Sequence, residues 1–217
     1  MISVIIPTWR RNQMLFDRAI PSILRQTVPT GEIIIVHDGN TRDGAEERDE
    51  VRDLERRAAE LGDSRIRLEP IRRQKYPPID RWLYWGLLGL KALNHGLAKA
   101  TGEWVAVLND DDEFLRKHHE TLLSVAAPGV DFVYGKSATP WGQEYGGWPP
   151  GDGQLAQGSY LYRGRARDYR YDLECIARRG LNGDADMWTR MYAEGVQFKQ
   201  TDKMVHRYHP SSTRNGE

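Results

Sequence analysis

Short apolar runs alternate with longer helical segments through the first half of the chain. Residues 3–6, 33–36 and 104–108 are almost continuously apolar and rich in β-branched side chains, a pattern typical of strands buried in a parallel sheet. Residues 65–68 alternate as a further strand, and helices are predicted over three ranges, 15–25, 45–61 and about 81–100. The order strand–helix–strand–helix–strand–loop–helix–strand predicts an α/β fold with a Rossmann-like, mostly parallel central sheet flanked by helices.

The second half of the chain has less regular patterning. A helix is predicted over residues 115–125, a strand over 131–134, a helix over 184–195, and residues 204–209 alternate like an edge strand. Residues 135–157 are rich in Gly, Pro and Trp without periodicity, and a segment of this kind in a compact domain is usually functional or disordered. With no internal repeat or low-complexity linker, residues 1–217 are interpreted as one domain whose halves are 1–115 and 116–217.

Composition narrows the possible functions. Lys and Arg together number 31 and Asp and Glu number 31, which excludes a uniformly cationic surface for nucleic acid or anionic lipid. No apolar run approaches the ~18–20 residues of a membrane helix, so we expect no transmembrane segment. Cys175 is the single cysteine, which excludes a disulfide framework and a Cys-based zinc site. The first seven residues look like a strand rather than a signal peptide, and we expect a cytoplasmic protein.

The strongest chemical feature is the acidic run Asn109-Asp110-Asp111-Asp112-Glu113, directly after a predicted strand. Ligands of open α/β sheets bind at the carboxyl ends of strands, so the run is well placed for a site. Consecutive carboxylates are costly to hold together without a cation, and Mg²⁺ or Mn²⁺ prefers oxygen ligands. The alternative is an acidic cap for the following helix. On the acidic run alone, the two interpretations have equal weight.

A second turn of interest follows residues 33–36. In His37-Asp38-Gly39-Asn40, a carboxylate and a glycine come directly after a buried strand, where Asp38 could accept hydrogen bonds from a base or a ribose. Taken alone, the segment is better explained as a strand–helix turn with local capping. No Gly-x-Gly-x-x-Gly motif follows a strand and no P-loop motif is present, which disfavours dinucleotide-binding dehydrogenases and P-loop enzymes.

Several segments together resemble family 2 glycosyltransferases of the GT-A fold. Any one of them is weak, but their order along the chain is specific. They are Ser3-Val4-Ile5-Ile6-Pro7-Thr8-Trp9-Arg10-Arg11, Ser22-Ile23-Leu24-Arg25-Gln26-Thr27, Val36-His37-Asp38-Gly39-Asn40, Asn94-His95-Gly96-Leu97-Ala98-Lys99-Ala100-Thr101-Gly102-Glu103-Trp104 and Leu108-Asn109-Asp110-Asp111-Asp112-Glu113. The resemblance implies a GT-A fold with a nucleotide-sugar-binding half, residues 1–115, and a less regular acceptor-binding half, residues 116–217.

The resemblance also implies site residues. Nucleotide binding is expected from Thr8 and Trp9, which would wall the base, Asp38, which would contact it, and Asp110, near the ribose. Asp111 is the expected ligand of Mn²⁺ or Mg²⁺, with His209 as an additional metal ligand. Because Asp110 and Asp112 also form an Asp-x-Asp pair, the register of the metal ligand stays open by one residue. Asn109 and His37 replace acids of the family pattern.

The resemblance places the catalytic base at the start of a later helix. Gly183-Asp184-Ala185-Asp186 fits this position, with Gly183 replacing an acid, and Asp184 is the expected base with Asp186 as the alternative. A diphosphate leaving group needs its charge neutralised, which a divalent cation does, and the acceptor hydroxyl needs a base within hydrogen-bond reach. Without the family context, Asp184 would be interpreted as an ordinary helix N-cap.

These implications predict a metal-dependent, inverting glycosyltransferase that moves a sugar from a nucleotide diphosphate-sugar, with UDP-sugar favoured, to a hydroxyl acceptor. A saccharide is the expected acceptor. Arginines interleaved with tyrosines over residues 160–180 leave open a nucleic-acid acceptor such as a modified DNA base, although a solvated mixed-charge surface is the preferred interpretation. A non-catalytic nucleotide- or sugar-binding module is a second alternative. A nucleotidyltransferase is weaker, because residues 9–12 contain no glycine.

Overall fold

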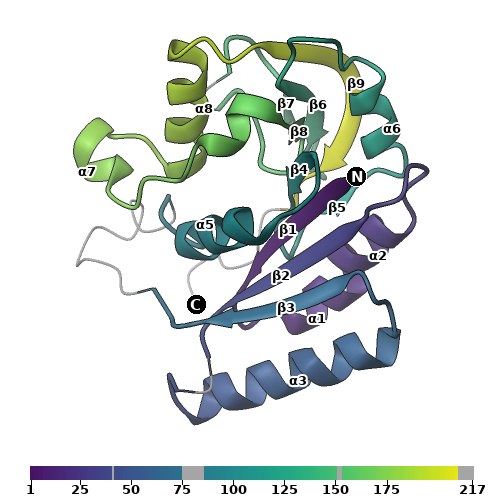
Figure 1. Ribbon diagram of the computed structural model, residues 1–217, viewed down its shortest axis with the longest axis vertical. Coiled ribbons are helices and arrows are strands. Elements are labelled where there is room, and N and C mark those ends of the chain that lie inside the picture. The colour runs from purple at the N-terminus through teal and green to yellow at the C-terminus, as the bar shows by residue number, and fades with distance from the viewer. Residues whose placement is uncertain (41, 75–85, 151–152, 210–217) are drawn as a thin grey trace.

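A computed structural model describes residues 1–40, 42–74, 86–150 and 153–209 (Figure 1). Its centre is a nine-stranded sheet in which eight strands follow the order β3-β2-β1-β4-β8-β6-β9-β5 and β7 pairs with β6. The strands are β1 (Ile2–Thr8), β2 (Glu32–Asp38), β3 (Ile66–Ile71), β4 (Trp104–Val107), β5 (Glu113–Phe114), β6 (Phe132–Ala138), β7 (Glu144–Tyr145), β8 (Tyr160–Tyr162) and β9 (Phe198–Arg207).

The first half of the sheet is parallel, as predicted. β1 lies between β2 and β4 and is parallel to both, and β2 is parallel to β3. Beyond β4 the sheet is mixed, because β8 is antiparallel to β4 and β6, whereas β9 is parallel to β6. The expectation that residues 204–209 form an edge strand is wrong. They belong largely to β9, which is paired with β6 on one side and β5 on the other.

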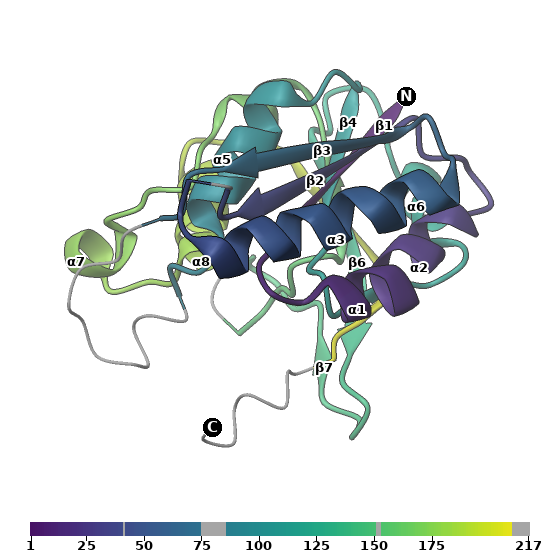
Figure 2. The ribbon, with the colours of Figure 1, turned by 90° about the horizontal axis from the view of Figure 1, so that it is seen from below.

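Helices cover both faces of the sheet (Figure 2). One face carries α1 (Asn12–Met14), the π-helical turn η1 (Leu15–Ala19), α2 (Ile20–Leu24) and α3 (Ala45–Leu61), and the other face carries α5 (Leu90–Lys99). The remaining helices are α6 (His118–Leu123), the 3₁₀ turn η2 (Gly164–Asp168), α7 (Cys175–Arg179) and α8 (Gly183–Ala193). The helix predicted over residues 81–100 begins at Leu90 in the described chain, and residues 81–85 lie outside the described residues.

Two hydrophobic cores explain the continuously apolar strands. Ile5 of β1 packs into the core under α5, whereas its neighbours Val4 and Ile6 pack into the core under α1–α3. A strand covered on both faces has no side that can be polar. Helix α5 approaches β1 so closely that a Cβ on Gly96 would lie 2.4 Å from a side-chain carbon of Ile5. Among the described residues, no helix has both the length and the apolar character to cross a membrane.

Candidate active site

The carboxyl ends of three neighbouring parallel strands bring the predicted nucleotide-binding residues to one edge of the sheet. Thr8 ends β1, Asp38 ends β2, and Asp110 follows β4. The Thr8 hydroxyl donates a hydrogen bond to Oδ2 of Asp110 (2.8 Å), and the backbone N–H of Gln74 donates to Oδ1 of Asp38 (2.9 Å). Sheet pairing therefore assembles residues that are about a hundred positions apart in the sequence.

Trp9, the fourth predicted nucleotide-binding residue, lies just beyond β1. Its indole face is covered by the guanidinium of Arg73, whose central carbon is 3.7 Å from the ring centroid. Arg10 is in the left-handed backbone region with φ 54°, and its side chain turns outward to pair with Glu46 and Glu47 at the start of α3. The side chains of the consecutive residues Arg10 and Arg11 therefore contact different partners.

Asp110 and Asp111 share one cation from the protein itself. Nη1 of Arg11 lies 3.3 Å from Oδ1 of Asp110 and 2.7 Å from Oδ2 of Asp111. Arg18, on the π-helical turn η1, donates from Nη1 to the backbone carbonyl of Asp111 (2.5 Å). Two arginines that the sequence analysis did not assign to the site therefore hold the acidic run. Arg11 stands within the first motif, but nothing local in the sequence indicates its partners.

Burial and mutual repulsion disfavour the ionised form of the carboxylates Asp110 and Asp111. Burial, then the charges of Asp112 and Asp110, raise the pKa of Asp111 to about 7. Burial also raises the pKa of Asp110, although Arg11 and the Thr8 hydroxyl act in the opposite direction. Ionised carboxylates at this position are therefore costly, which is the condition under which a bound cation contributes most.

Asp112 is held by the protein on both of its carboxylate oxygens. The side-chain amide of Asn109 donates to Oδ2 (2.9 Å), and the backbone N–H of His209 donates to Oδ1 (2.8 Å). Nε2 of His206 lies 3.6 Å from the same Oδ2. Asn109, which replaces an acid of the family pattern, thus serves as a donor that fixes Asp112. Asp112 is therefore fixed by groups of the protein itself.

His209, the second predicted metal ligand, lies beside the acidic run. Its Nε2 is 3.4 Å from Oε1 of Glu113, and burial followed by the charge of Arg18 lowers its pKa, which favours the neutral ring that a metal needs. Within the described ranges, which end at residue 209, no group of three or more His, Cys, Asp or Glu side chains could hold a metal ion. Asp110 and Asp111 still fit the one or two carboxylates that Mg²⁺ takes when phosphate oxygens complete its shell.

The predicted base lies at the start of α8, which packs next to the segment leading into α5. The backbone N–H of Gly183 donates to the carbonyl of Gly86 (2.8 Å), and a Cβ at position 183 would come within 2.5 Å of a Leu90 methyl group. Packing therefore accounts for the glycine at this position. The N-cap of α8 is Asn182, whose Oδ1 accepts from the backbone N–H of Ala185 (3.0 Å). Asp184 is therefore not the N-cap that the sequence alone would suggest.

Asp186, the alternative base, is a structural residue. Its side chain is completely buried, and its two oxygens pair with Arg179 and with Arg190, the latter at 2.9 Å. Both carboxylate oxygens of Asp186 therefore bond to side chains of the protein itself.

The arginines between residues 160 and 180 bond within the protein. Their partners are carboxylates or backbone carbonyls, as in Arg163 with Glu103, Arg167 with the carbonyl of Ala100, and Arg178 with Glu174. Arg165 and Arg170 donate to carbonyls, and Arg179 pairs with Asp172. This supports the interpretation of a mixed-charge surface over that of an arginine patch for nucleic acid.

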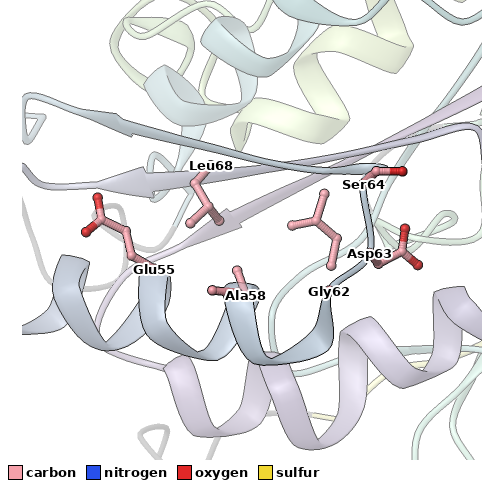
Figure 3. A pocket seen from close by; sticks show the side chains of 8 residues that line it. Glu55, Ala58, Gly62, Asp63, Ser64 and Leu68 are labelled. Carbon is pink, nitrogen blue, oxygen red and sulfur yellow. The ribbon is translucent and has the colours of Figure 1, made fainter.

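Two hollows lie on the α3 side of the sheet. A shallow groove of about 390 Å³ runs between α3 and β3 and is lined by small and apolar side chains such as Ala58 and Leu68 (Figure 3). It contains none of the predicted site residues. A larger cavity of about 700 Å³ lies between α1 and α3, next to the acidic run, and Arg11, Arg18 and Glu113 are among its lining residues.

Three buried histidines pack behind Asp112. Nδ1 of His118 and Nδ1 of His119 are 2.9 Å apart, Nε2 of His119 is 2.9 Å from the Thr30 hydroxyl, and His118 stacks on Phe114 with ring centroids 3.9 Å apart. The third, His206, is completely buried, and its Nδ1 is 2.7 Å from the Ser137 hydroxyl. This cluster, which joins segments from across the chain, was not predicted from the sequence.

Acidification is expected to destabilise the protein through this cluster. Burial lowers the pKa of His119 to about 4, and burial followed by the charges of His119 and His206 lowers that of His118 well below its ordinary value. Protons therefore bind the unfolded chain more readily. The stability contribution of His119, of the order of 3 kcal/mol, is complete above pH ~6.5 and is lost as the pH falls towards about 4.

The measurement is the free energy of unfolding in urea at several pH values across this window. His119→Gln should reduce the pH dependence of the free energy of unfolding. An identical pH dependence in wild type and His119→Gln would contradict the assignment.

Parts of this chain are similar in sequence to known glycosyltransferases. The model of the family described as Glycosyl transferase family 2 matches residues 85–204. The GalNAc(5)-diNAcBac-PP-undecaprenol beta-1,3-glucosyltransferase of Campylobacter jejuni is 34% identical over 134 residues, which are 62% of this chain and 37% of that protein. The uncharacterized glycosyltransferase YibD of Escherichia coli is 29% identical over 126 residues, 58% of this chain and 30% of that protein. The chain spans about a third of the length of these relatives.

Solved structures show the same fold. The crystal structure of Staphylococcus aureus TarS superposes with a TM-score of 0.65 at 15% identity, over 97% of this chain and 37% of that one. The complex of TarS residues 1–349 with UDP-GlcNAc gives a TM-score of 0.62 at 15% identity, over 97% of this chain and 59% of that one. This likeness confirms the predicted α/β class of GT-A type, with its mostly parallel sheet and flanking helices.

Proposed function

This chain belongs to glycosyl transferase family 2, and from this premise we propose that it transfers a sugar from a nucleotide diphosphate-sugar to a hydroxyl acceptor with inversion at the anomeric carbon. The observation that carries the proposal is the convergence of Thr8, Asp38, Asp110 and Asp111 at the carboxyl edge of the parallel strands. This is the position at which open α/β sheets bind their ligands.

The chain's own residues have distinct roles in the proposed reaction. Thr8 and Trp9 wall the base and Asp38 contacts it, while Asp110, which accepts the Thr8 hydroxyl, lies near the ribose. Asp111 would hold Mn²⁺ or Mg²⁺, with His209 as the further protein ligand. When bound, the cation neutralises charge on the diphosphate leaving group. Asp184, the second residue of α8, is the proposed acceptor of the proton of the acceptor hydroxyl, on the basis of the family resemblance, and its Oδ1 accepts the backbone N–H of Ala185 at 3.0 Å.

UDP is the favoured nucleotide and a saccharide the favoured acceptor. The support for UDP is the neighbour TarS, whose complexes contain UDP and UDP-GlcNAc. The support for a saccharide is the Campylobacter relative, which is named for glucosyl transfer to a polyprenyl-linked glycan. A nucleic-acid acceptor receives less support, because the arginines between residues 160 and 180 bond to protein groups.

The deciding experiment is calorimetry with UDP and GDP, each with and without Mn²⁺, followed by a donor-hydrolysis assay with UDP-sugars. We expect UDP to bind only weakly without Mn²⁺ and tightly with it, and we expect slow hydrolysis of at least one UDP-sugar. Metal-dependent binding without hydrolysis or transfer to any saccharide would favour the non-catalytic binding module instead. Absence of nucleotide binding under all conditions would refute the proposed function.

A further inference from the structure

We propose that Arg11 is a built-in counter-cation of the acidic run, which occupies the position between Asp110 and Asp111 in the ligand-free protein and is displaced when a divalent cation binds. The inference rests on the proposed function in one respect, namely that Asp111 takes the metal. It adds an exchange of one cation for another, and it makes Arg11 a positioning residue for the metal site.

The contacts of Arg11 are those of a bridging cation. A single nitrogen, Nη1, lies 2.7 Å from Oδ2 of Asp111 and 3.3 Å from Oδ1 of Asp110. The other oxygen of Asp110 already accepts the Thr8 hydroxyl at 2.8 Å. A metal ion bound to Asp111 beside Asp110 would lie close to the guanidinium of Arg11, and repulsion between the two cations would favour displacement of this side chain.

The acidic run needs this charge when no metal is bound. Asp110, Asp111 and Asp112 are 5%, 6% and 0% exposed, and adjacent buried carboxylates repel one another strongly. Arg18 does not replace Arg11, because its hydrogen bond goes to the backbone carbonyl of Asp111 rather than to a carboxylate. Arg11 is therefore the guanidinium that contacts two of these carboxylates among the described residues.

The side chain of Arg11 borders a cavity into which it can rotate. It is 27% exposed and lines the cavity of about 700 Å³ between α1 and α3, together with the acidic residues Asp17, Glu50 and Asp53. Its backbone is fixed, since its carbonyl accepts the N–H of Leu15 at 3.0 Å. Rotation of the side chain alone can move the guanidinium from Asp111 towards other carboxylates, so displacement does not require the helix to move.

The first test measures Mn²⁺ affinity by calorimetry near pH ~8 without nucleotide, in wild type, Arg11→Gln and Arg25→Gln. Arg25 is the matched control, because it pairs with Glu113 of the same acidic run at 3.3 Å but is half exposed and does not contact Asp110 or Asp111. Removing the competing charge-assisted hydrogen bonds should tighten Mn²⁺ binding about tenfold in Arg11→Gln. Arg25→Gln should change the affinity less than about twofold, because exposed charges are screened.

A thermal readout separates counter-charge from a merely structural role. Without metal, Arg11→Gln should have a lower Tm than wild type, and saturating Mn²⁺ should remove most of that difference. An equal loss of Tm with and without Mn²⁺ would overturn the proposal, as would unchanged or weaker Mn²⁺ binding. If Arg11→Gln does not fold, an NMR measurement on the wild type decides. It follows the Nε–Hε resonance of Arg11, which is assigned by its absence in Arg11→Lys. This resonance should shift on addition of Mg²⁺, and no shift would overturn the proposal.

The outcomes distinguish this inference from the proposed function. If wild type binds Mn²⁺ and Asp111→Asn does not, while Arg11→Gln binds as wild type does, the exchange is refuted and the metal site stands. If wild type binds no divalent cation even with UDP present, both the metal dependence and the exchange are refuted.

Discussion

Replacing Asp184 by asparagine is expected to lower kcat by about 10²–10⁴-fold, the usual contribution of a general base. Asparagine keeps the size and polarity of the side chain but cannot accept the acceptor's proton. The helix should survive the change, because Asn182 supplies the N-cap of α8 and the loss of one carboxylate in the first turn costs only about 0.3–1 kcal/mol. Initial rates of sugar transfer, measured with the best donor from the binding experiments, together with the Tm, check both parts of this expectation.

Asp186→Asn is the matched control on the same helix. Its side chain is completely buried between Arg179 and Arg190, and removing one partner of a buried ion pair typically costs about 3–5 kcal/mol. We therefore expect a large loss of stability with the folded fraction retaining most of its turnover. The opposite pattern, with turnover lost in Asp186→Asn and kept in Asp184→Asn, would exchange the two assignments.

Asp111→Asn is expected to abolish measurable Mn²⁺ binding and, with it, the metal-dependent part of UDP affinity. In the absence of metal, the same substitution should not lower the stability of the folded protein. Burial and the neighbouring carboxylates raise the pKa of Asp111 to about 7, above the ordinary value of about 3.9. The folded state therefore binds the proton more tightly than the unfolded state, and ionised Asp111 destabilises the protein as the pH rises from about 4 to 7.

In metal-free buffer above pH ~7, Asp111→Asn should therefore unfold at a Tm equal to or higher than that of wild type. Asp112→Asn serves as the comparison, since both oxygens of Asp112 accept hydrogen bonds from Asn109 and His209. This second change should lower the Tm and alter Mn²⁺ affinity far less. Strong loss of Mn²⁺ binding in Asp112→Asn together with wild-type binding in Asp111→Asn would place the metal in the other register.

Local patterns in the sequence were enough to predict the order of the main elements. Continuous apolar runs predicted β1, β2 and β4 because strands covered on both faces have no polar side, and helical periodicity predicted α3 with the same bounds that the structure has. The resemblance to the family supplied the roles of Thr8, Asp38 and Asp110, and parallel pairing places all three at one edge. The start of α5 was predicted less well, because turns before Leu90 interrupt a pattern that looks helical in sequence.

The tertiary structure decided which acidic residues are fixed by other groups of the protein. The sequence offers Asp110, Asp111 and Asp112 as nearly equivalent carboxylates, and it offers Asp184 and Asp186 likewise. Their hydrogen-bond donors come from residues distant in the chain. Asp112 accepts from His209, 97 positions later, and Asp111 accepts from Arg11, 100 positions earlier.

The sequence by itself therefore determined the class of fold and the edge of the sheet where chemistry is expected, because both follow from periodicity and from turns next to strands. Only the tertiary structure decided which carboxylates are fixed, which share Arg11, and that three histidines are buried behind the acidic run. The physical reason is that burial and partner charge set the protonation and the availability of a carboxylate, and neither quantity exists until distant segments pack together.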